Sequence, residues 1–224
     1  MKKAIIIGAS GAIGSALSAA CESAGMSVVR LSRPEIDLTS EASIMAAAAA
    51  LKTQGYFDLI FVASGILQTP ILQPEKTIKQ IDPEHLHTLY QINAIGPILV
   101  LKHFASLFDP EKSSIFAALS ARVGSISDNH LGGWYGYRAS KAALNMLLKT
   151  ASIEYHRTHK SLIIAGLHPG TVDSKLSKPF QANVPKEQLF TPEFAAQQLL
   201  QVLGNLTPED SGNCFDWSGE KIEF

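Results

Sequence analysis

Cysteine is scarce in this 224-residue sequence, which contains only Cys21 and Cys214. Neither belongs to a C-x-x-C pair or to a spacing typical of zinc, so a disulfide framework and a cysteine-bound metal are excluded. The seven histidines show no ligand spacing that an acidic or sulfur neighbour supports, and we expect no metal site. Two isolated thiols are typical of a reducing compartment, which predicts a cytoplasmic location.

Charge is scarce as well. Charged residues make up 17% of the chain, the formal net charge is −1, and there is no basic or acidic tract. This balance argues against nucleic acid and anionic membranes as partners. The apolar run 4–7, behind Lys2 and Lys3, is shorter than that of a signal peptide. No stretch approaches the roughly 20 apolar residues of a membrane span, so we expect neither a signal peptide nor a membrane segment.

Apolar residues are plentiful, at 46%, and they form short runs that alternate with helical periods. Runs that are apolar on both faces and separated by helices are typical of a parallel sheet with helices on both sides. No linker or internal repeat divides the chain, so we expect one α/β domain over residues 1–224. The predicted strands are 3–8, 27–32, 36–38, 58–64, 113–120, 161–168 and 213–217. The predicted helices are 12–24, one from about residue 40 capped by Thr39 or Ser40, 83–108 with a bend near Gly96-Pro97, 135–156 and 192–203.

A glycine-rich turn, Gly8-Ala9-Ser10-Gly11-Ala12-Ile13-Gly14, follows the first predicted strand. Between a strand and a helix, such a turn lets backbone N–H groups approach a pyrophosphate at the helix N-terminus. Gly8 would form the tight turn, Gly11 would allow close approach, and Gly14 would let helix and strand pack. A merely flexible turn is the alternative, but the position between first strand and first helix favours a dinucleotide site.

Tyr137 and Lys141 lie four residues apart in a predicted helix, so their side chains share one face. An ammonium at that range favours the ionised form of a neighbouring phenol, and we expect Lys141 to lower the pKa of Tyr137. A phenol with a lowered pKa is suited to act as a general acid or base near neutral pH. The alternative is an ordinary amphipathic helix that carries both residues by chance.

Further motifs follow in a fixed order along the chain: Asp37-Leu38, Asn93, a serine near position 120, Tyr137-x-x-x-Lys141, Pro169-Gly170 and a final Gly212…Phe215…Gly219. Together with the glycine turn, this ordered set resembles the short-chain dehydrogenase/reductase family. The stretches Arg122-Val123-Gly124-Ser125 and Gly132-Gly133-Trp134-Tyr135 are similar to those of its small C-factor-like and sniffer-like reductases. The resemblance implies a doubly wound Rossmann-type domain with a seven-stranded parallel sheet in the order 3-2-1-4-5-6-7.

The resemblance also implies a nicotinamide cofactor. The second predicted strand ends in Ser32-Arg33, with no acid before Glu35, and an arginine there accommodates the 2′-phosphate of NADP, so NADP(H) is favoured over NAD(H). Two departures from the family pattern stand out: the turn reads G-x-x-G-x-x-G, and the usual N-N-A-G is Val62-Ala63-Ser64-Gly65. The implied cofactor-binding residues are Gly8, Ser10, Gly11, Ile13, Gly14, Ser32, Arg33, Asp37, Leu38, Ser64, Gly65, Tyr137, Lys141, Pro169, Gly170, Thr171 and Val172.

The implied catalytic residues are Tyr137 as proton donor or acceptor, Lys141 beside the cofactor ribose, and Asn93 in the proton relay. The family's serine is not assigned: its position aligns with Ala121, and the role is open between Ser120 and Ser125. His168 ends a predicted strand, where a lone histidine is more often structural than catalytic.

Together these features predict an NADP(H)-dependent carbonyl reductase or alcohol dehydrogenase that assembles as a homodimer or homotetramer. A dinucleotide-binding sensor without turnover remains the alternative, because the N-N-A-G motif is altered and the serine is unassigned. A purely structural module explains neither end of the expected site. The segments 66–72, 126–134 and 173–188 are expected to line a pocket for a small or medium apolar carbonyl compound.

Overall fold

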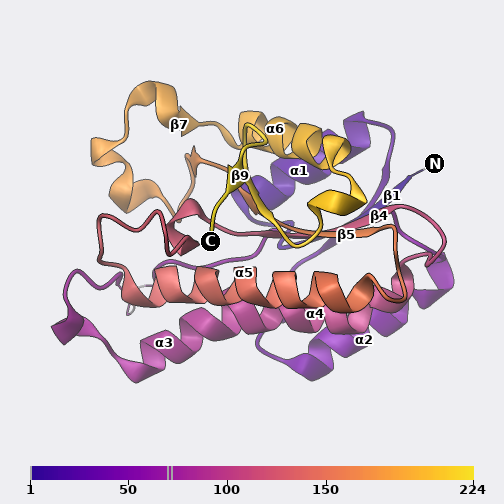
Figure 1. Cartoon of the computed structure of the whole chain (residues 1–224), viewed down its shortest axis with the longest axis horizontal. Coiled ribbons are helices and arrows are strands. Elements are labelled where there is room, and N and C mark those ends of the chain that lie inside the picture. Colours follow the sequence, from indigo (N-terminus) through magenta and orange to yellow (C-terminus); the bar gives the residue numbers. More distant parts are fainter. Residues whose placement is uncertain (1, 70, 72) are drawn as a thin grey trace.

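The computed structural model describes residues 2–69, 71 and 73–224. Its central sheet has seven strands in the order β2-β1-β3-β4-β5-β8-β9, and a small separate sheet pairs β6 with β7. Helices cover both faces of the central sheet (Figure 1). The Rossmann-type α/β fold is therefore confirmed. The strands are β1 (Lys3–Ile7), β2 (Ser27–Leu31), β3 (Leu59–Val62), β4 (Ser114–Leu119), β5 (Leu162–His168), β6 (Thr171–Val172), β7 (Leu189–Phe190), β8 (Cys214–Asp216) and β9 (Lys221–Ile222).

Six of the seven predicted strands pair in the predicted order, and the seventh differs. The segment 36–38 is not a strand, because its backbone is engaged in a turn: Asp37 N–H donates to Ser43 Oγ at 2.9 Å, and Thr39 N–H donates to Asp37 Oδ1 at 2.9 Å. The observed sheet has its seventh strand, β9, at the opposite edge, where it pairs antiparallel with β8.

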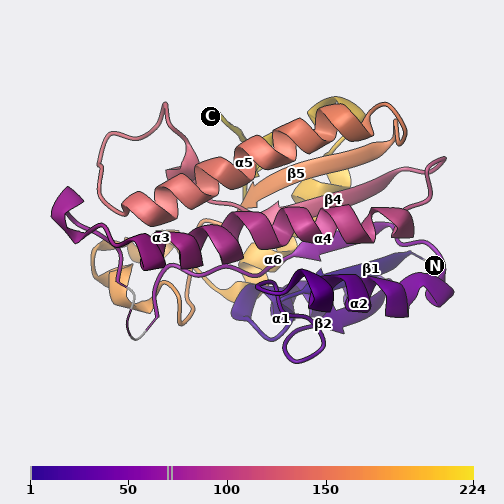
Figure 2. The ribbon, with the colours of Figure 1, turned by 90° about the horizontal axis from the view of Figure 1, so that it is seen from below.

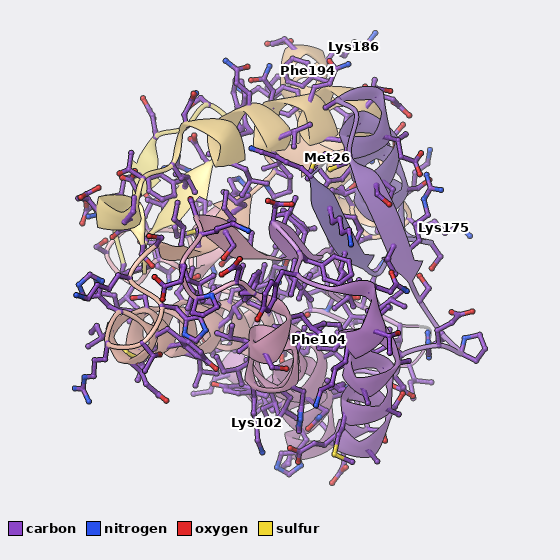
Figure 3. All side chains as sticks on the ribbon, turned by 90° about the vertical axis from the view of Figure 1, so that its right-hand side faces the viewer. Met26, Lys102, Phe104, Lys175, Lys186 and Phe194 are labelled. Atoms are coloured by element: carbon purple, nitrogen blue, oxygen red, sulfur yellow. The ribbon has the colours of Figure 1, made fainter. Side chains whose placement is uncertain are left out.

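The described residues form six α-helices, which make up the two outer layers. On one face α1 packs against α6, and on the other α2, α4 and α5 lie side by side (Figures 1 and 2). Figure 3 shows Phe104 in one helical layer and Phe194 in the other. Within the described residues, no helix has both the length and the apolar character needed to cross a bilayer. The helices are α1 (Ala12–Ser23), α2 (Glu41–Leu51), α3 (Pro83–Tyr90), α4 (Gly96–Phe104), α5 (Tyr135–Tyr155) and α6 (Pro192–Asn205).

The predicted long helix 83–108 is interrupted as expected near Gly96-Pro97, and the interruption is a π-turn over Gln91–Ile95. Gly96 N–H donates to the carbonyl of Gln91, five residues back, in place of the usual four. Pro97 has no N–H group, so the carbonyl of Asn93 lacks its α-helical donor. The turn widens the helix at Asn93, whose side chain is fully buried.

The core lies on both faces of the sheet, which is why its central strands are apolar throughout. Residues 4–7 of β1 and 60–62 of β3 are completely buried. The carboxyl ends of β1, β3, β4 and β5 all lie at one edge of the sheet, because these strands are parallel. In sheets of this kind, ligands bind beyond that edge.

Candidate active site

The glycine turn is shaped by close backbone contacts. Gly8 has φ +84°, and its N–H donates to the carbonyl of Leu31 at 2.8 Å. A Cβ on Gly8 would lie 2.5 Å from Ser64 Oγ, and one on Gly14 would lie 2.2 Å from the carbonyl oxygen of Gly8. No side chain fits at either position without moving the backbone, so the turn is a cradle closed to larger residues.

A cleft of about 260 Å³ opens beside this turn. It begins at the N-terminus of α1, where Gly11 is the N-cap and supplies no side-chain hydrogen bond. The first N–H groups of a helix have no intrahelical acceptor, and they attract an anionic ligand. This arrangement fits the phosphates of a dinucleotide. Nine predicted cofactor residues line the cleft: Gly8, Ser10, Gly11, Ser32, Arg33, Asp37, Leu38, Ser64 and Gly65.

Two further predicted residues, Ile13 and Gly14, lie in the first turn of α1. The side chain of Ile13 packs against the core cluster that holds residues of α1 and α6, and Ile13 does not line the cleft. Gly14 lies directly against Gly8, as its predicted packing role requires.

The far end of the cleft carries Arg33. No carboxylate approaches its exposed guanidinium within 4.0 Å in the described part of the chain. The neighbouring Ser32 Oγ accepts a 2.9 Å hydrogen bond from the N–H of Ser10, which links the second strand end to the glycine turn. Hydrogen bonds from Thr39, helped by the nearby charge of Arg33, lower the pKa of Asp37. One cationic and one anionic side chain therefore flank this end of the cleft.

Asn93 joins the cleft to α5. Its Oδ1 accepts from the N–H of Ile66 at 2.9 Å, and its Nδ2 donates to the carbonyl of Ile66 at 2.8 Å and to Ser140 Oγ at 3.1 Å. Ser140 Oγ in turn donates to the carbonyl of Tyr137 at 2.8 Å. The π-turn thus fixes both the loop after β3 and the helical turn that carries the tyrosine.

Tyr137 and Lys141 lie on one face of α5, but the expected pKa effect is wrong. Lys141 Nζ lies 5.8 Å from the centroid of the Tyr137 ring and donates to the carbonyl of Leu119 at 2.7 Å. Burial, rather than the ammonium, dominates, and it raises the pKa of Tyr137 to about 12. Burial also lowers the pKa of Lys141, which is 2% exposed, to about 8.

The two candidate serines have different surroundings. Ser120, which is buried, donates from its Oγ to Asn145 Oδ1 at 2.6 Å. Ser125 Oγ accepts from the N–H of Asp128 at 3.2 Å, in the turn that follows β4. The residue before it, Gly124, packs against α5, since a Cβ there would lie 2.8 Å from Lys141 Cβ. Among the described contacts, neither serine is hydrogen-bonded to Tyr137.

His168 has the surroundings of a structural residue. Its Nδ1 is buried and has no hydrogen-bond partner in the described residues, and burial lowers its pKa to about 4. Nearby, Arg122 pairs with the buried carboxylate of Asp216 at 2.8 Å. In the part of the chain that the structure describes, no three His, Cys, Asp or Glu side chains group as metal ligands.

The four predicted cofactor residues after β5, 169–172, do not line the described cleft and pack instead against an aromatic group. Gly170 has φ +75°, and a Cβ there would lie 2.6 Å from the ring of Phe190. Pro169 and Val172 are buried, whereas Thr171 is half-buried and pairs with Leu189 in the small sheet. This turn therefore rests on the cluster of Phe190, Phe194 and Trp217.

Two residues of the predicted pocket segments, Trp134 and Phe180, form an aromatic stack beside Tyr137, and one buried acid nearby was not predicted. The Trp134 ring lies 6.2 Å from the Tyr137 ring and 4.9 Å from that of Phe180. Glu75, which is 2% exposed, accepts from the N–H of Gly136 at the start of α5. The sequence predicted a helix that starts near residue 135. No sequence pattern indicated that Glu75, some sixty residues earlier, would contact that helix start.

An α/β sheet with a glycine cradle, a cleft beside it and a Tyr–Lys pair near that cleft is the arrangement expected of a dinucleotide-dependent enzyme. A family model described as short chain dehydrogenase matches residues 33–185. The chain belongs to that family and is an oxidoreductase.

Relatives and solved structures agree with this assignment. The 1-hydroxy-2-glutathionyl-2-methyl-3-butene dehydrogenase of Rhodococcus sp. is 32% identical over 180 residues, which cover 80% of this chain and 74% of the relative. C-signal of Myxococcus xanthus is 31% identical over 144 residues, which cover 64% and 81%. The carbonyl reductase Sniffer of D. melanogaster superposes over the whole of both chains with a TM-score of 0.82 at 18% identity. The resemblance to the C-factor-like and sniffer-like group is confirmed.

Proposed function

We propose that the protein is an NADP(H)-dependent carbonyl reductase or alcohol dehydrogenase with Tyr137 as its proton donor and acceptor. The observation that carries this proposal is the position of Gly65, which lines the cleft. A Cβ on Gly65 would lie 3.4 Å from Asn93 Oδ1 and 3.5 Å from Lys141 Nζ. The cofactor cleft and the proposed acid–base residues thus meet at one point.

The nicotinamide supplies or accepts hydride when the cofactor is bound. With its pKa near 12, the phenol of Tyr137 is protonated at neutral pH, which is the form that donates a proton to a carbonyl oxygen during reduction. The Lys141 ammonium, held by the carbonyl of Leu119 beside the cleft, is available to a ribose hydroxyl. Asn93 keeps this helical turn and the loop after β3 in register.

Ser125 is proposed as the serine that binds the substrate oxygen. The Ser120 hydroxyl already donates to Asn145, which leaves it no proton to donate toward a substrate. The Ser125 oxygen accepts a backbone N–H and lies 3.2 Å from Ser127 Oγ, so its own proton can be directed elsewhere. Its turn packs against Lys141, at the catalytic end of the cleft.

NADP(H) is proposed over NAD(H) because Arg33 lies at the cleft end that would receive the adenosine ribose. Its planar guanidinium has no carboxylate within 4.0 Å in the described residues and is suited to a 2′-phosphate. The adjacent Ser32 hydroxyl adds a polar group at the same point.

A small or medium apolar carbonyl compound is the proposed substrate. Of the predicted pocket segments, 126–134 contributes Trp134 and 173–188 contributes Phe180, and their rings are in contact beside Tyr137. In 66–72, residues 70 and 72 lie outside the described residues. Lys175 and Lys186 of the segment 173–188 point outward in Figure 3, so these lysines do not favour an anionic substrate.

The test is a panel of apolar aldehydes and ketones with NADPH at neutral pH, followed by the loss of NADPH absorbance. Turnover on at least one compound is expected. A second candidate, a dinucleotide-binding sensor, is favoured by the lack of a described hydrogen bond between either serine and Tyr137. Tight NADPH binding together with silence across the panel would support the sensor and overturn the reductase.

We also propose that the protein works in the cytoplasm as a homodimer or homotetramer. Both cysteines are free and buried, which suits a reducing compartment. Met146 and Ile153, seven residues apart on α5, expose 67% and 57% of their surface, enough to support pairing through this helix. Sedimentation should give a mass at least twice 24.1 kDa.

A further inference from the structure

We propose that Glu75 is a positioning residue, whose buried carboxylate fixes the first turn of α5 and thereby the phenol of Tyr137. This inference rests on the proposed function, since it assigns a role in the same site. Glu75 lies in the loop between β3 and α3, more than sixty residues before the tyrosine. No other acid of the chain is buried to this extent: Glu75 is 2% exposed, and Asp216 follows at 5% among the described residues.

Two hydrogen bonds connect Glu75 to the helix start. Its backbone carbonyl accepts from the N–H of Trp134 at 2.6 Å, and its side-chain Oε2 accepts from the N–H of Gly136 at 3.2 Å. Trp134 is the N-cap of α5 and adopts a left-handed conformation, φ 51° and ψ 42°, that a non-glycine residue rarely occupies. It makes no side-chain cap, so Glu75 supplies the acceptors that a capping residue otherwise provides.

Glu75 and Gly136 are in direct contact. A Cβ on Gly136 would lie 2.9 Å from Glu75 Oε1 and 2.6 Å from Leu89 Cδ1. Glycine is therefore required at 136 for the carboxylate to reach the helix. Tyr137 is the next residue, so a displacement of the Gly136 backbone is transmitted directly to the phenol.

The charge of Glu75 also suits this position. A carboxylate at a helix N-terminus is stabilised by the N–H groups and the dipole of the first turn. The second oxygen, Oε1, is buried and has no hydrogen-bond partner among the described residues. Burying a carboxylate with one oxygen unpaired lowers stability. A residue that only filled space here would not need to carry that cost. Its role is to orient the helix start, because the N–H groups of Trp134 and Gly136 both bond to Glu75 and Tyr137 is the next residue.

The test compares Glu75→Ala with Glu75→Gln, whose amide oxygen can still accept from the N–H of Gly136. Glu84→Gln, at an exposed acid in the first turn of α3, is the matched control. Displacing a catalytic group by about 1 Å can cost up to about 100-fold in rate. We expect Glu75→Ala to lower kcat at least about tenfold with the Kd for NADPH unchanged, and Glu75→Gln to restore kcat to within about threefold of wild type.

Three results would overturn the proposal: a kcat for Glu75→Ala within twofold of wild type, a Glu75→Gln variant no more active than Glu75→Ala, or a parallel loss of NADPH affinity. If wild type turns over no carbonyl compound, the proposed function fails separately. The positioning role is then read from near-ultraviolet circular dichroism in a Trp217→Phe background, where Trp134 is the only indole. Glu75→Ala should remove this signal and Glu75→Gln should keep it; an unchanged signal in Glu75→Ala contradicts the proposal.

Discussion

Backbone groups shape the cleft, whereas side chains from separate segments shape the proposed proton-transfer centre beside it. At the cleft, Gly8 and Gly14 touch through main-chain atoms within one short stretch of sequence. At the centre, Asn93 comes from a π-turn, Tyr137 from α5 and Glu75 from the loop between β3 and α3. The first region tolerates almost no added atom, and the second depends on the placement of whole elements.

The largest effect is expected at the glycine cradle. Gly14→Ala would place a Cβ 2.2 Å from the carbonyl oxygen of Gly8 and force the turn open. We expect NADPH affinity to fall by about 100-fold or more, since misplaced donors lose several phosphate hydrogen bonds. Gly204→Ala, where a Cβ would meet nothing within 4 Å, is the control and should bind NADPH like wild type. Equal affinity in both variants would show that the cradle is not under this constraint.

The buried ammonium of Lys141 should appear in the pH dependence of stability. Its pKa is lowered from 10.5 to about 8 in the folded protein, so the unfolded state binds more protons between these pH values. The free energy of unfolding therefore rises as the pH increases from about 8 to 10. Below pH 8 the full cost of burying the charged ammonium is present.

Lys141→Met has no such titration and serves as the reference. At pH 7 the variant is expected to be the more stable, and its advantage should shrink by about 2 kcal/mol between pH 8 and 10. Denaturant unfolding at each pH measures the difference. A constant difference would mean that the ammonium is not desolvated as the structure indicates.

A smaller effect is expected for cofactor choice. Arg33→Ala should raise the Kd for NADPH about tenfold and leave the Kd for NADH within twofold, because only the 2′-phosphate loses a charge-assisted partner. Arg30→Ala removes an exposed arginine that already pairs with Glu22 at 2.9 Å, and it should change neither constant. Equal weakening of both cofactors by Arg33→Ala would exclude its role as a selector.

The smallest expected difference is in kcat between variants of the two candidate serines. Ser125→Ala should lower kcat about tenfold through loss of one donor to the substrate oxygen. Ser120→Ala should change kcat less than about threefold, because it removes only the hydrogen bond to Asn145. Steady-state kinetics on the same carbonyl substrate compares them. The reverse order of effects would assign the substrate contact to Ser120.

The cleft was predictable because its determinants are local. A strand, a glycine turn and a helix in sequence leave little freedom for the backbone, and nine predicted residues line one cavity. The sheet order followed from the resemblance, except at its edges. At one edge, the backbone N–H groups of Asp37 and Thr39 donate to the side-chain oxygens of Ser43 and Asp37 instead of forming a strand, which spacing does not reveal.

The sequence was enough to name the members of the proposed proton-transfer centre, but not their electrostatics. Spacing places Lys141 on the face of Tyr137, yet the ammonium lies over the ring and bonds to Leu119. Burial then controls both pKa values, and burial depends on the whole fold. Glu75 was missed for the same reason, because its partner Gly136 is brought near only by tertiary packing.

The most direct measurement is the oxidation of NADPH by wild type and by Tyr137→Phe on one carbonyl substrate, with NADPH binding titrated in parallel. The variant lacks only the phenolic hydroxyl. We predict a fall in kcat of about 100-fold or more, since general acid catalysis supplies that much, with the Kd for NADPH within twofold of wild type. Turnover that survives in Tyr137→Phe would contradict proton transfer through this residue.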